Sequence, residues 1–371
     1  MSISGPRVRD LTGRKRRLSV EVVSGAAFEL LASAFVVTLG EAEVPEYEAG
    51  RELLERTRGA ASPGLLAQLE EIGQGDLWLG FIGQAYESPE PRRVETFLDY
   101  LGGADPVAVR RDLVAMQVHK KEAPAEIIDR VAAGDSEALE HLAALCDQEC
   151  ASALRALLSL PPPDTVEKVL DVLRRFDDEV FHGGEDTAAA LARDAAEKQA
   201  LAASMSPNRL VETATNGVTF TMQPEVSGVV LIPSAVTRPW VANLEHGNLR
   251  LFVYPVAEEV LSADPDAPSP WMLGFYKALA DESRLRILNL LAASPASLSQ
   301  VAEHLGLAKS TVIHHMRALR TAGLVLITVG AEKEYSLRTQ AIPEAGRLLR
   351  AYLSGPVGAE GASSESERTR R

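Results

Sequence analysis

Residues 309–320 form a cationic, hydrogen-bonding segment that contains no acidic residue. At helical spacing, Val312, Met316 and Leu319 fall together as an apolar stripe that a protein core would cover. The side chains that could contact a polyanion lie opposite that stripe or along its edges: Lys309, Ser310, Thr311, His314, Arg317 and Arg320. Such groups can reach phosphates and base edges in the major groove, where a carboxylate would be repelled. The segment therefore predicts a helix that binds double-stranded DNA.

The residues before this segment have the pattern needed to position it. Asp281 stands where it can begin one helix, and Ser297 with Gln300 has the spacing of a capping box, which fixes the start of a second, short helix. Gly306 would end that short helix in the left-handed conformation, and the next helix would begin near Lys309. A short helix, a glycine turn and a longer helix are the layout of a helix-turn-helix.

A β-hairpin is predicted after the second helix of this motif. Residues 324–329 and 334–337 have strand composition and flank a short turn, and residues 343–353 predict a closing helix. A hairpin in this position is a wing. Lys333, at its tip, is a further candidate for a DNA contact, although two glutamates flank it and we expect the wing to bind weakly.

Residues 271–353 resemble the ArsR/SmtB family of winged helix-turn-helix repressors. The resemblance rests on residues 278–288, ALADESRLRIL, and residues 305–324, LGLAKSTVIHHMRALRTAGL. It implies a homodimer built on the first and last helices of the module, operator binding by the second helix of the motif in each half-site, and control of DNA binding by a signal. The resemblance covers less than a quarter of the chain.

Three departures from the family pattern bear on function. The family's metal sensors use cysteines in the helix before the turn or histidine in the last helix, and neither 299–305 nor 343–353 supplies them. We therefore expect no metal site and no other cofactor. Ala308 stands where the family has a Ser or Thr helix cap, and Ile313 where it has a small polar residue. Losing a cap costs about 1 kcal/mol, so packing must hold the start of this helix.

The rest of the chain predicts a mainly α, overall α+β protein. Residues 1–17 read as a flexible basic arm, 18–260 as an N-terminal helical domain with a small sheet, 261–270 as a linker, 271–353 as the winged helix-turn-helix and 354–371 as a disordered tail. Within the N-terminal domain, three β-branched or aromatic runs near 218–222, 228–233 and 249–254 predict a small antiparallel sheet. Residues 18–23 could add an opening strand.

Charge is distributed unevenly along the chain. The formal net charge is −14, but residues 270–355 carry ten Lys and Arg against six Asp and Glu, and residues 1–269 carry 25 against 43. A mildly basic module attached to an acidic body is typical of a chain whose one end binds nucleic acid or a partner.

Two cysteines are too few for a disulfide-stapled secreted fold. Cys146 and Cys150, with His141 nearby, could bind a metal or sense oxidants, or could be small buried side chains on one helix face. The apolar run 26–39 is interrupted by Glu29 and is too short to span a bilayer. We therefore expect no membrane association and a cytoplasmic, nucleoid-associated protein.

These observations together predict a sequence-specific DNA-binding transcriptional regulator of the ArsR type, acting as a repressor and a homodimer. The N-terminal domain would be a sensor for an unknown small molecule or an extra dimerisation platform. No GxxxxGK[ST], HExxH or GxSxG motif occurs, so we expect no enzyme activity. The alternative is a winged helix used for protein–protein contact in a non-catalytic regulatory assembly.

Overall fold

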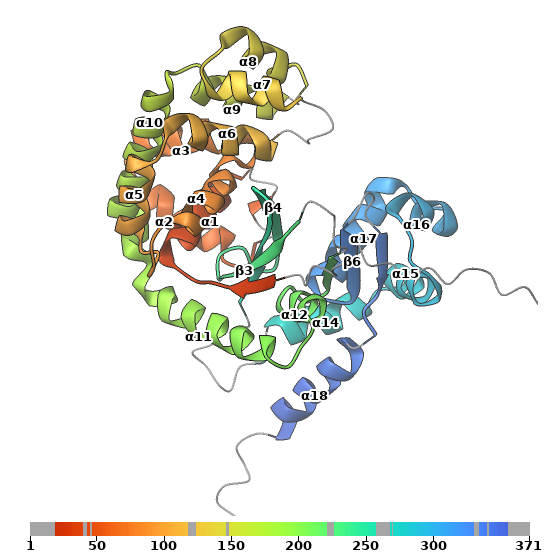
Figure 1. Ribbon diagram of the computed structural model, residues 1–371. Helices are drawn as coiled ribbons and strands as arrows, with labels where there is room; N and C mark the ends of the chain where they lie inside the picture. The colour runs from red at the N-terminus through yellow and green to blue at the C-terminus, as the bar shows by residue number, and fades with distance from the viewer. Residues whose placement is uncertain are drawn as a thin grey trace, which may run out of the picture.

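A helical body encloses a small sheet, and a C-terminal part lies beside it (Figure 1). This mixture of helices with some sheet confirms the predicted mainly α, α+β class. The computed structural model describes residues 19–39, 43–44, 47–117, 124–145, 148–220, 226–256, 268, 270–329, 334–339 and 341–354. The predicted basic arm, Lys333, most of the predicted linker and all but the first residue of the predicted tail lie outside the described residues.

Helices of the body pack in an arc around one face of the sheet (Figure 1). They are α1 (Ala26–Val37), α2 (Gly50–Ala60), α3 (Pro63–Gly73), the 3-10 helix η2 (Gln74–Phe81), α4 (Ile82–Glu87), α5 (Val94–Gly103), α6 (Pro106–Gln117), α7 (Ala125–Ala132), α8 (Ser136–Ala143), α9 (Gln148–Leu158), α10 (Pro162–Phe176), the π-helical turn η3 (Asp177–Phe181) and the short η4 (His182–Gly184). Two more, α11 (Glu185–Ala202) and α12 (Pro207–Ala214), lead to the other face. Every residue of α1 is buried, because that helix lies at the centre of the arc.

The sheet of the body is mixed, which corrects the expected antiparallel arrangement. Its order is β1-β3-β5-β4, built from β1 (Ser19–Val22), β3 (Gly228–Ser234), β5 (Leu249–Pro255) and β4 (Ala242–His246). The first three strands are parallel, and only the edge strand β4 runs antiparallel to its neighbour. The opening strand predicted within 18–23 is confirmed as β1.

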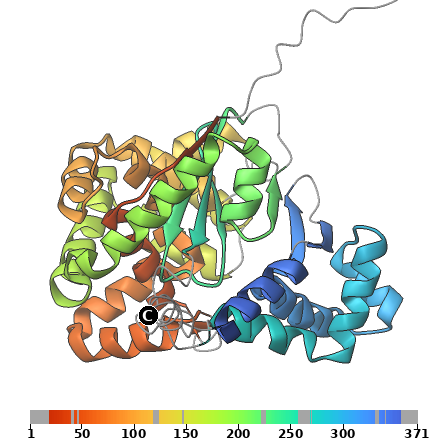
Figure 2. The same ribbon diagram turned by 90° about the horizontal axis from the view of Figure 1, so that it is seen from below.

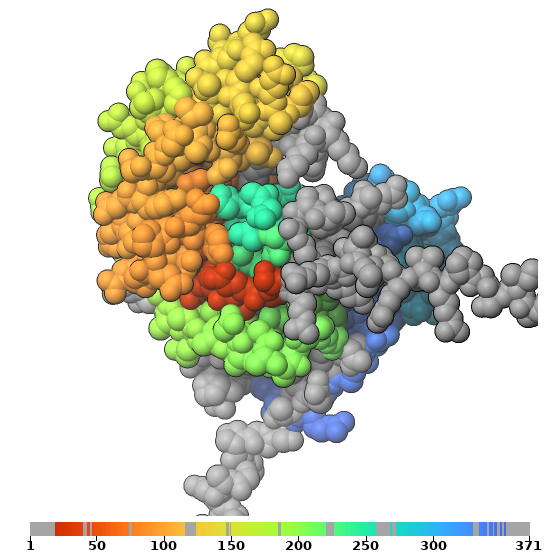
Figure 3. All heavy atoms as spheres, viewed as in Figure 1, coloured from red at the N-terminus to blue at the C-terminus, as the bar shows by residue number. Residues whose placement is uncertain are grey.

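Burial on both faces explains the parallel arrangement. Val230 and Ile232 face the core of the helical arc, whereas Val229 and Leu231 face the core that α11 and α12 cover. All seven residues of β3 are buried, so its sequence is continuously apolar instead of alternating. The edge strands β1, in red, and β4, in teal, reach the surface of the molecule (Figure 3).

The C-terminal part has the predicted order of elements. It contains α14 (Pro270–Leu279), α15 (Glu282–Ala293), α16 (Leu298–Leu305), α17 (Lys309–Thr321), β6 (Val325–Val329), β7 (Glu334–Leu337) and α18 (Ala341–Ser354). Asp281 caps α15 as expected, and β6 and β7 pair antiparallel as a hairpin. The last helix begins two residues before Pro343, because a proline in the first turn lacks only an N–H that would have no helical partner.

One strand joins the two parts of the molecule, and its pairing differs from the one expected from the sequence. The run near 218–222 does not enter the sheet of the body; β2 (Val218–Phe220) pairs in parallel with β6, giving the order β2-β6-β7. The C-terminal helices therefore cluster beside the body and are tied to it through the wing (Figure 2).

Candidate nucleic-acid interface

The turn between α16 and α17 is fixed by local hydrogen bonds. The backbone N–H of Ser297 donates to Oε1 of Gln300 at 2.8 Å, and the backbone N–H of Gln300 donates to Oγ of Ser297 at 3.4 Å. This is the predicted capping box, and it is confirmed. Gly306 ends α16 at φ 64°, a conformation that glycine adopts without strain.

Helix α17 is anchored through the predicted apolar stripe. Val312, Met316 and Leu319 are all buried in the core of the C-terminal part. Ala308 supplies no side-chain cap to the helix start, as its sequence position indicated. Packing of the stripe therefore holds α17, with its opposite face turned outward.

The first half of that outward face is open. Lys309, Ser310, Thr311 and His314 are exposed and lie on the same part of the helix, and no acidic side chain stands among them. His315, in contrast, is mostly buried, with Nδ1 3.8 Å from Oδ1 of Asp281. The open half of α17 thus presents the hydrogen-bonding and cationic groups that a phosphate backbone attracts.

The second half of the face meets the helical body. The guanidinium carbons of Arg317 and Arg320 lie 5.8 and 4.9 Å from the ring centroid of Trp240. Nη2 of Arg320 also donates to the backbone oxygen of Val241 at 3.3 Å. Burial lowers the pKa of the Arg320 guanidinium. Arg317 remains exposed beside Trp240, whereas Arg320 is half-buried and set apart from Lys309 and its neighbours.

Helical spacing alone did not reveal the contact with Trp240. Trp240 lies 77 positions before Arg317 and 80 before Arg320 in the sequence, and no short-range pattern links the ring to the arginines. Lys333, the wing residue predicted to contact DNA, lies outside the described residues. DNA contact by any of these side chains remains a prediction.

Of His141, Cys146 and Cys150, which the sequence offered as a possible metal or redox site, the structure describes His141 and Cys150. Cys150 is buried, Cys146 lies outside those residues, and His141 is exposed. In the part of the chain that the structure describes, no group of three or more His, Cys, Asp and Glu could hold a metal ion. Nor does any described helix combine the length and apolar character needed to cross a membrane.

Two helices joined by a glycine turn and followed by a hairpin define a winged helix-turn-helix. The family model described as "Bacterial regulatory protein, arsR family" matches residues 281–326. The HTH-type transcriptional regulator CmtR of Mycobacterium bovis is 39% identical over 80 residues, which are 21% of this chain and 68% of that protein, and its namesake in Mycobacterium tuberculosis matches equally. The transcriptional repressor SmtB homolog of Synechocystis sp. is 37% identical over 86 residues, 23% of this chain and 63% of that protein.

The chain belongs to the ArsR family of bacterial regulatory proteins, and the match lies in its C-terminal part. The body formed by α1 to α12 and the sheet lies outside the stretch that the family model covers.

Proposed function

We propose that this protein is a sequence-specific DNA-binding transcriptional regulator that acts as a repressor. The observation that carries the proposal is the open, carboxylate-free first half of α17, held outward on a winged helix-turn-helix. Relatives named as transcriptional regulators and a transcriptional repressor support it, and they favour regulation over catalysis. The proposed DNA contacts are Lys309, Ser310, Thr311, His314, Arg317, Arg320 and Lys333.

A homodimer would present two such helices to DNA. Five large apolar side chains are exposed on the first and last helices of the C-terminal part: Leu273, Tyr276, Ile342, Tyr352 and Leu353. A second copy of the chain would cover them, since exposed apolar patches commonly mark association surfaces. The dimer would read a pseudo-palindrome whose half-sites lie about one helical turn of DNA apart.

The body would be the sensor of this regulator. It contacts α17 through Trp240 and the wing through β2, so a change in the body can reach both elements that would lie on DNA. A small-molecule effector bound to the body would therefore alter DNA binding. Acting on DNA, the protein would work in the cytoplasm at the nucleoid.

The test is salt-dependent binding to the DNA immediately upstream of the protein's own gene. Each phosphate contact contributes about 0.9 to the slope of log affinity against log salt, so Arg317→Ala should lower both the affinity and the slope, the latter by about one unit. Arg286→Ala is the matched control, because Arg286 is also exposed but pairs with Glu282 at 2.6 Å on α15.

The outcomes separate the two readings of the winged helix. If Arg317→Ala binds with the wild-type affinity and slope, the proposed face is wrong. If the wild-type protein shifts no DNA at any salt concentration, the alternative of a protein-contact module replaces the proposal. The exposed side chain of Ile313, in the middle of α17, is the observation that favours this alternative.

A further inference from the structure

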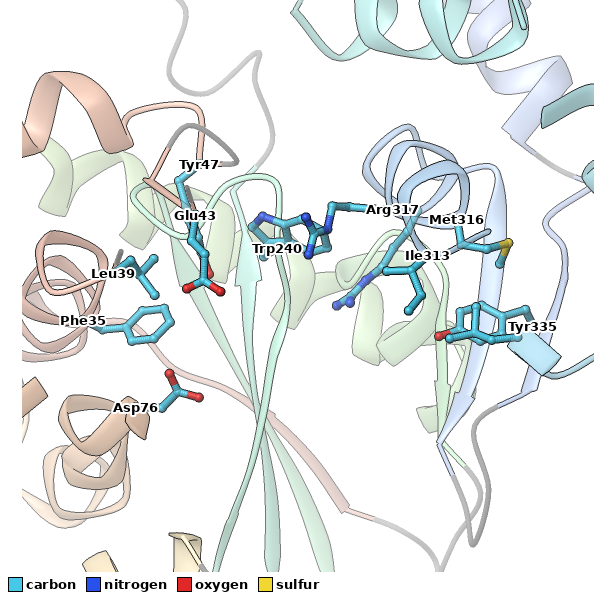
Figure 4. Close-up of a pocket in the computed structure, with 12 residues that line it drawn as sticks. Phe35, Leu39, Glu43, Tyr47, Asp76, Trp240, Ile313, Met316, Arg317 and Tyr335 are labelled. Carbon is cyan, nitrogen blue, oxygen red and sulfur yellow. The ribbon is translucent and has the colours of Figure 1, made fainter. Parts of the chain in front are cut away.

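A cleft separates α17 from the helical body (Figure 4). Its volume is about 370 Å³, and an adjoining hollow of about 380 Å³ shares Phe35, Trp240 and Arg320 with it. Pockets for small molecules generally measure from about 300 to 1,000 Å³. Together the two hollows are large enough for a molecule of two or more fused rings.

Aromatic rings line the cleft on both sides. Trp240 stands between the two walls, with Phe35 and Tyr47 on the body side and Tyr335 on the winged-helix side (Figure 4). Phe35 and Tyr47 pack edge to face with their centroids 6.1 Å apart, which holds both rings in place. A flat, apolar ligand would find ring faces to stack against.

The charges of the cleft are divided between its walls. The body side carries the carboxylates of Glu43 and Asp76, and the α17 side carries the guanidinium group of Arg317 (Figure 4). Arg320, also on α17, lines the cleft as well. Asp76 has a left-handed backbone, with φ 64°, which is uncommon for residues other than glycine and is often found at functional sites. A ligand with a cationic group toward the body side and an anionic group toward the α17 side would match the charges of both walls.

We propose that this cleft binds the effector, a planar aromatic molecule that carries an anionic group at one end and an amine at the other. The anionic group lies against Arg317 and Arg320, the ring system packs among Phe35, Tyr47 and Trp240, and the amine faces Glu43 and Asp76. Guanidinium groups form strong, charge-assisted hydrogen bonds with carboxylate, phosphate or sulfonate oxygens.

The regulation that follows rests on the proposed function. Arg317 is both a proposed phosphate contact and a wall of the cleft, so one guanidinium cannot serve DNA and the ligand at once. The ligand also bridges α17 to the body and keeps the helix there. Ligand binding therefore weakens DNA binding, and DNA weakens ligand binding by the same factor.

Calorimetric titration of the full chain with a defined probe tests the site. The probe is a naphthalene with a carboxylate on one ring and an aminomethyl group on the other; naphthoate and naphthylmethylamine each carry one of these charges. We expect the doubly charged probe to bind at least about tenfold more tightly than either singly charged compound, as one charge-assisted hydrogen bond accounts for such a factor. Equal binding of all three, or no binding of the doubly charged probe, overturns the site.

Conservative variants assign each end of the probe. Arg317→Gln or Arg320→Gln should reduce binding of the doubly charged probe to the level of the amine alone. Asp76→Asn combined with Glu43→Gln should reduce it to the level of naphthoate. Arg286→Gln, a change of the same kind on α15 and away from the cleft, should leave binding unchanged. Uniform loss in all of these variants, the control included, contradicts the assignment.

Competition with DNA distinguishes this inference from the proposed function. A wild-type protein that binds DNA but none of the probes refutes the cleft alone. One that binds the doubly charged probe but no DNA refutes the proposed function alone. If both bind and saturating probe leaves the DNA affinity unchanged, the coupling between cleft and helix is wrong.

Discussion

Glu29 places a carboxylate in the core of the body, on a helix whose other residues are buried as well. Oε2 accepts from the hydroxyl of Ser234 at 2.7 Å, and Oε1 accepts from the backbone N–H groups of Ala235 and Val236 at 3.0 and 2.8 Å. These donors are the last residue of β3 and the two residues that follow it, so the carboxylate binds the carboxyl end of that strand. Burial nevertheless raises the pKa of the Glu29 carboxyl, and the hydrogen bonds oppose the shift only in part.

The raised pKa of Glu29 predicts the sign of a pH dependence. A group whose pKa is higher in the folded state stabilises that state at low pH, and this contribution is lost as pH rises above the ordinary value of 4.5 toward the folded-state pKa. The Glu29→Gln variant cannot ionise there. The free energy of unfolding of this variant, measured by urea denaturation, should therefore rise relative to that of the wild type between pH 5 and pH 8. Glu55→Gln, at an exposed position on α2, is the control, and parallel pH profiles of wild type and Glu29→Gln would contradict the prediction.

The capping box at the start of α16 is a local device that a single substitution can test. Ser297→Ala removes the acceptor of the Gln300 N–H bond, so the free energy of unfolding of the C-terminal part should fall by about 1 kcal/mol. Ser299→Ala, an exposed position in the same turn, should change it by less than about 0.5 kcal/mol. Two equal losses in denaturant titrations would show that the cap contributes nothing.

The strand β2 is the element that fastens the wing to the body. The backbone N–H of Ile327 donates to the oxygen of Gly217 at 3.0 Å, and Oγ1 of Thr219 lies 3.0 Å from Oγ1 of Thr328. Arg338 adds a bond from Nη1 to Oδ1 of Asn216 at 2.8 Å. These contacts hold the wing in one arrangement with the body.

A glycine substitution should loosen that attachment. Gly217 has φ 114°, and an added Cβ would lie 3.0 Å from the backbone oxygen of Val325, so Gly217→Ala introduces both strain and crowding. We expect the free energy needed to open β2 locally to fall by about 1.4 kcal/mol. The amide hydrogen of Ile327 should then exchange about tenfold faster. Gly103→Ala, where an added Cβ meets nothing within 4 Å, is the control. Unchanged exchange at Ile327 would mean that β2 does not depend on this glycine.

At the scale of the whole molecule, the proposed dimer is the arrangement that decides how two copies of α17 meet DNA. Leu353 on α18 is 73% exposed, and Leu145, just after α8, is 44% exposed. Only the first lies on the surface that we assign to the partner copy. A charge placed at Leu353 would be buried on association, whereas one at Leu145 would stay in water.

The dimer surface is therefore tested by one pair of substitutions. Leu353→Glu should shift the protein from dimer to monomer in analytical ultracentrifugation and weaken DNA binding with it, because each copy would then hold one half-site alone. Leu145→Glu should sediment as the wild type. A monomeric wild-type protein, or a Leu353→Glu variant that remains dimeric, would show that this surface is not the interface.

The sequence by itself determined the local features of the C-terminal part. The capping box at Ser297, the turn at Gly306 and the buried stripe beginning at Val312 depend on residues a few positions apart, so their spacing was sufficient to predict them. The same reasoning failed for the sheet of the body. The continuous apolar run of β3 was compatible with several pairings, and only helices packed on both of its faces made the parallel one favourable.

Tertiary structure alone decided what surrounds α17. Helical spacing put Arg317 and Arg320 toward the outward side of the helix, but it contained no information about Trp240, which a separate segment of the chain brings against them. Nor could the sequence pattern show that β2 would pair with the wing strand β6 instead of joining β3 and β5 in the sheet of the body. Contacts between distant segments depend on how whole elements bury their apolar faces together, and no short stretch of sequence carries that information.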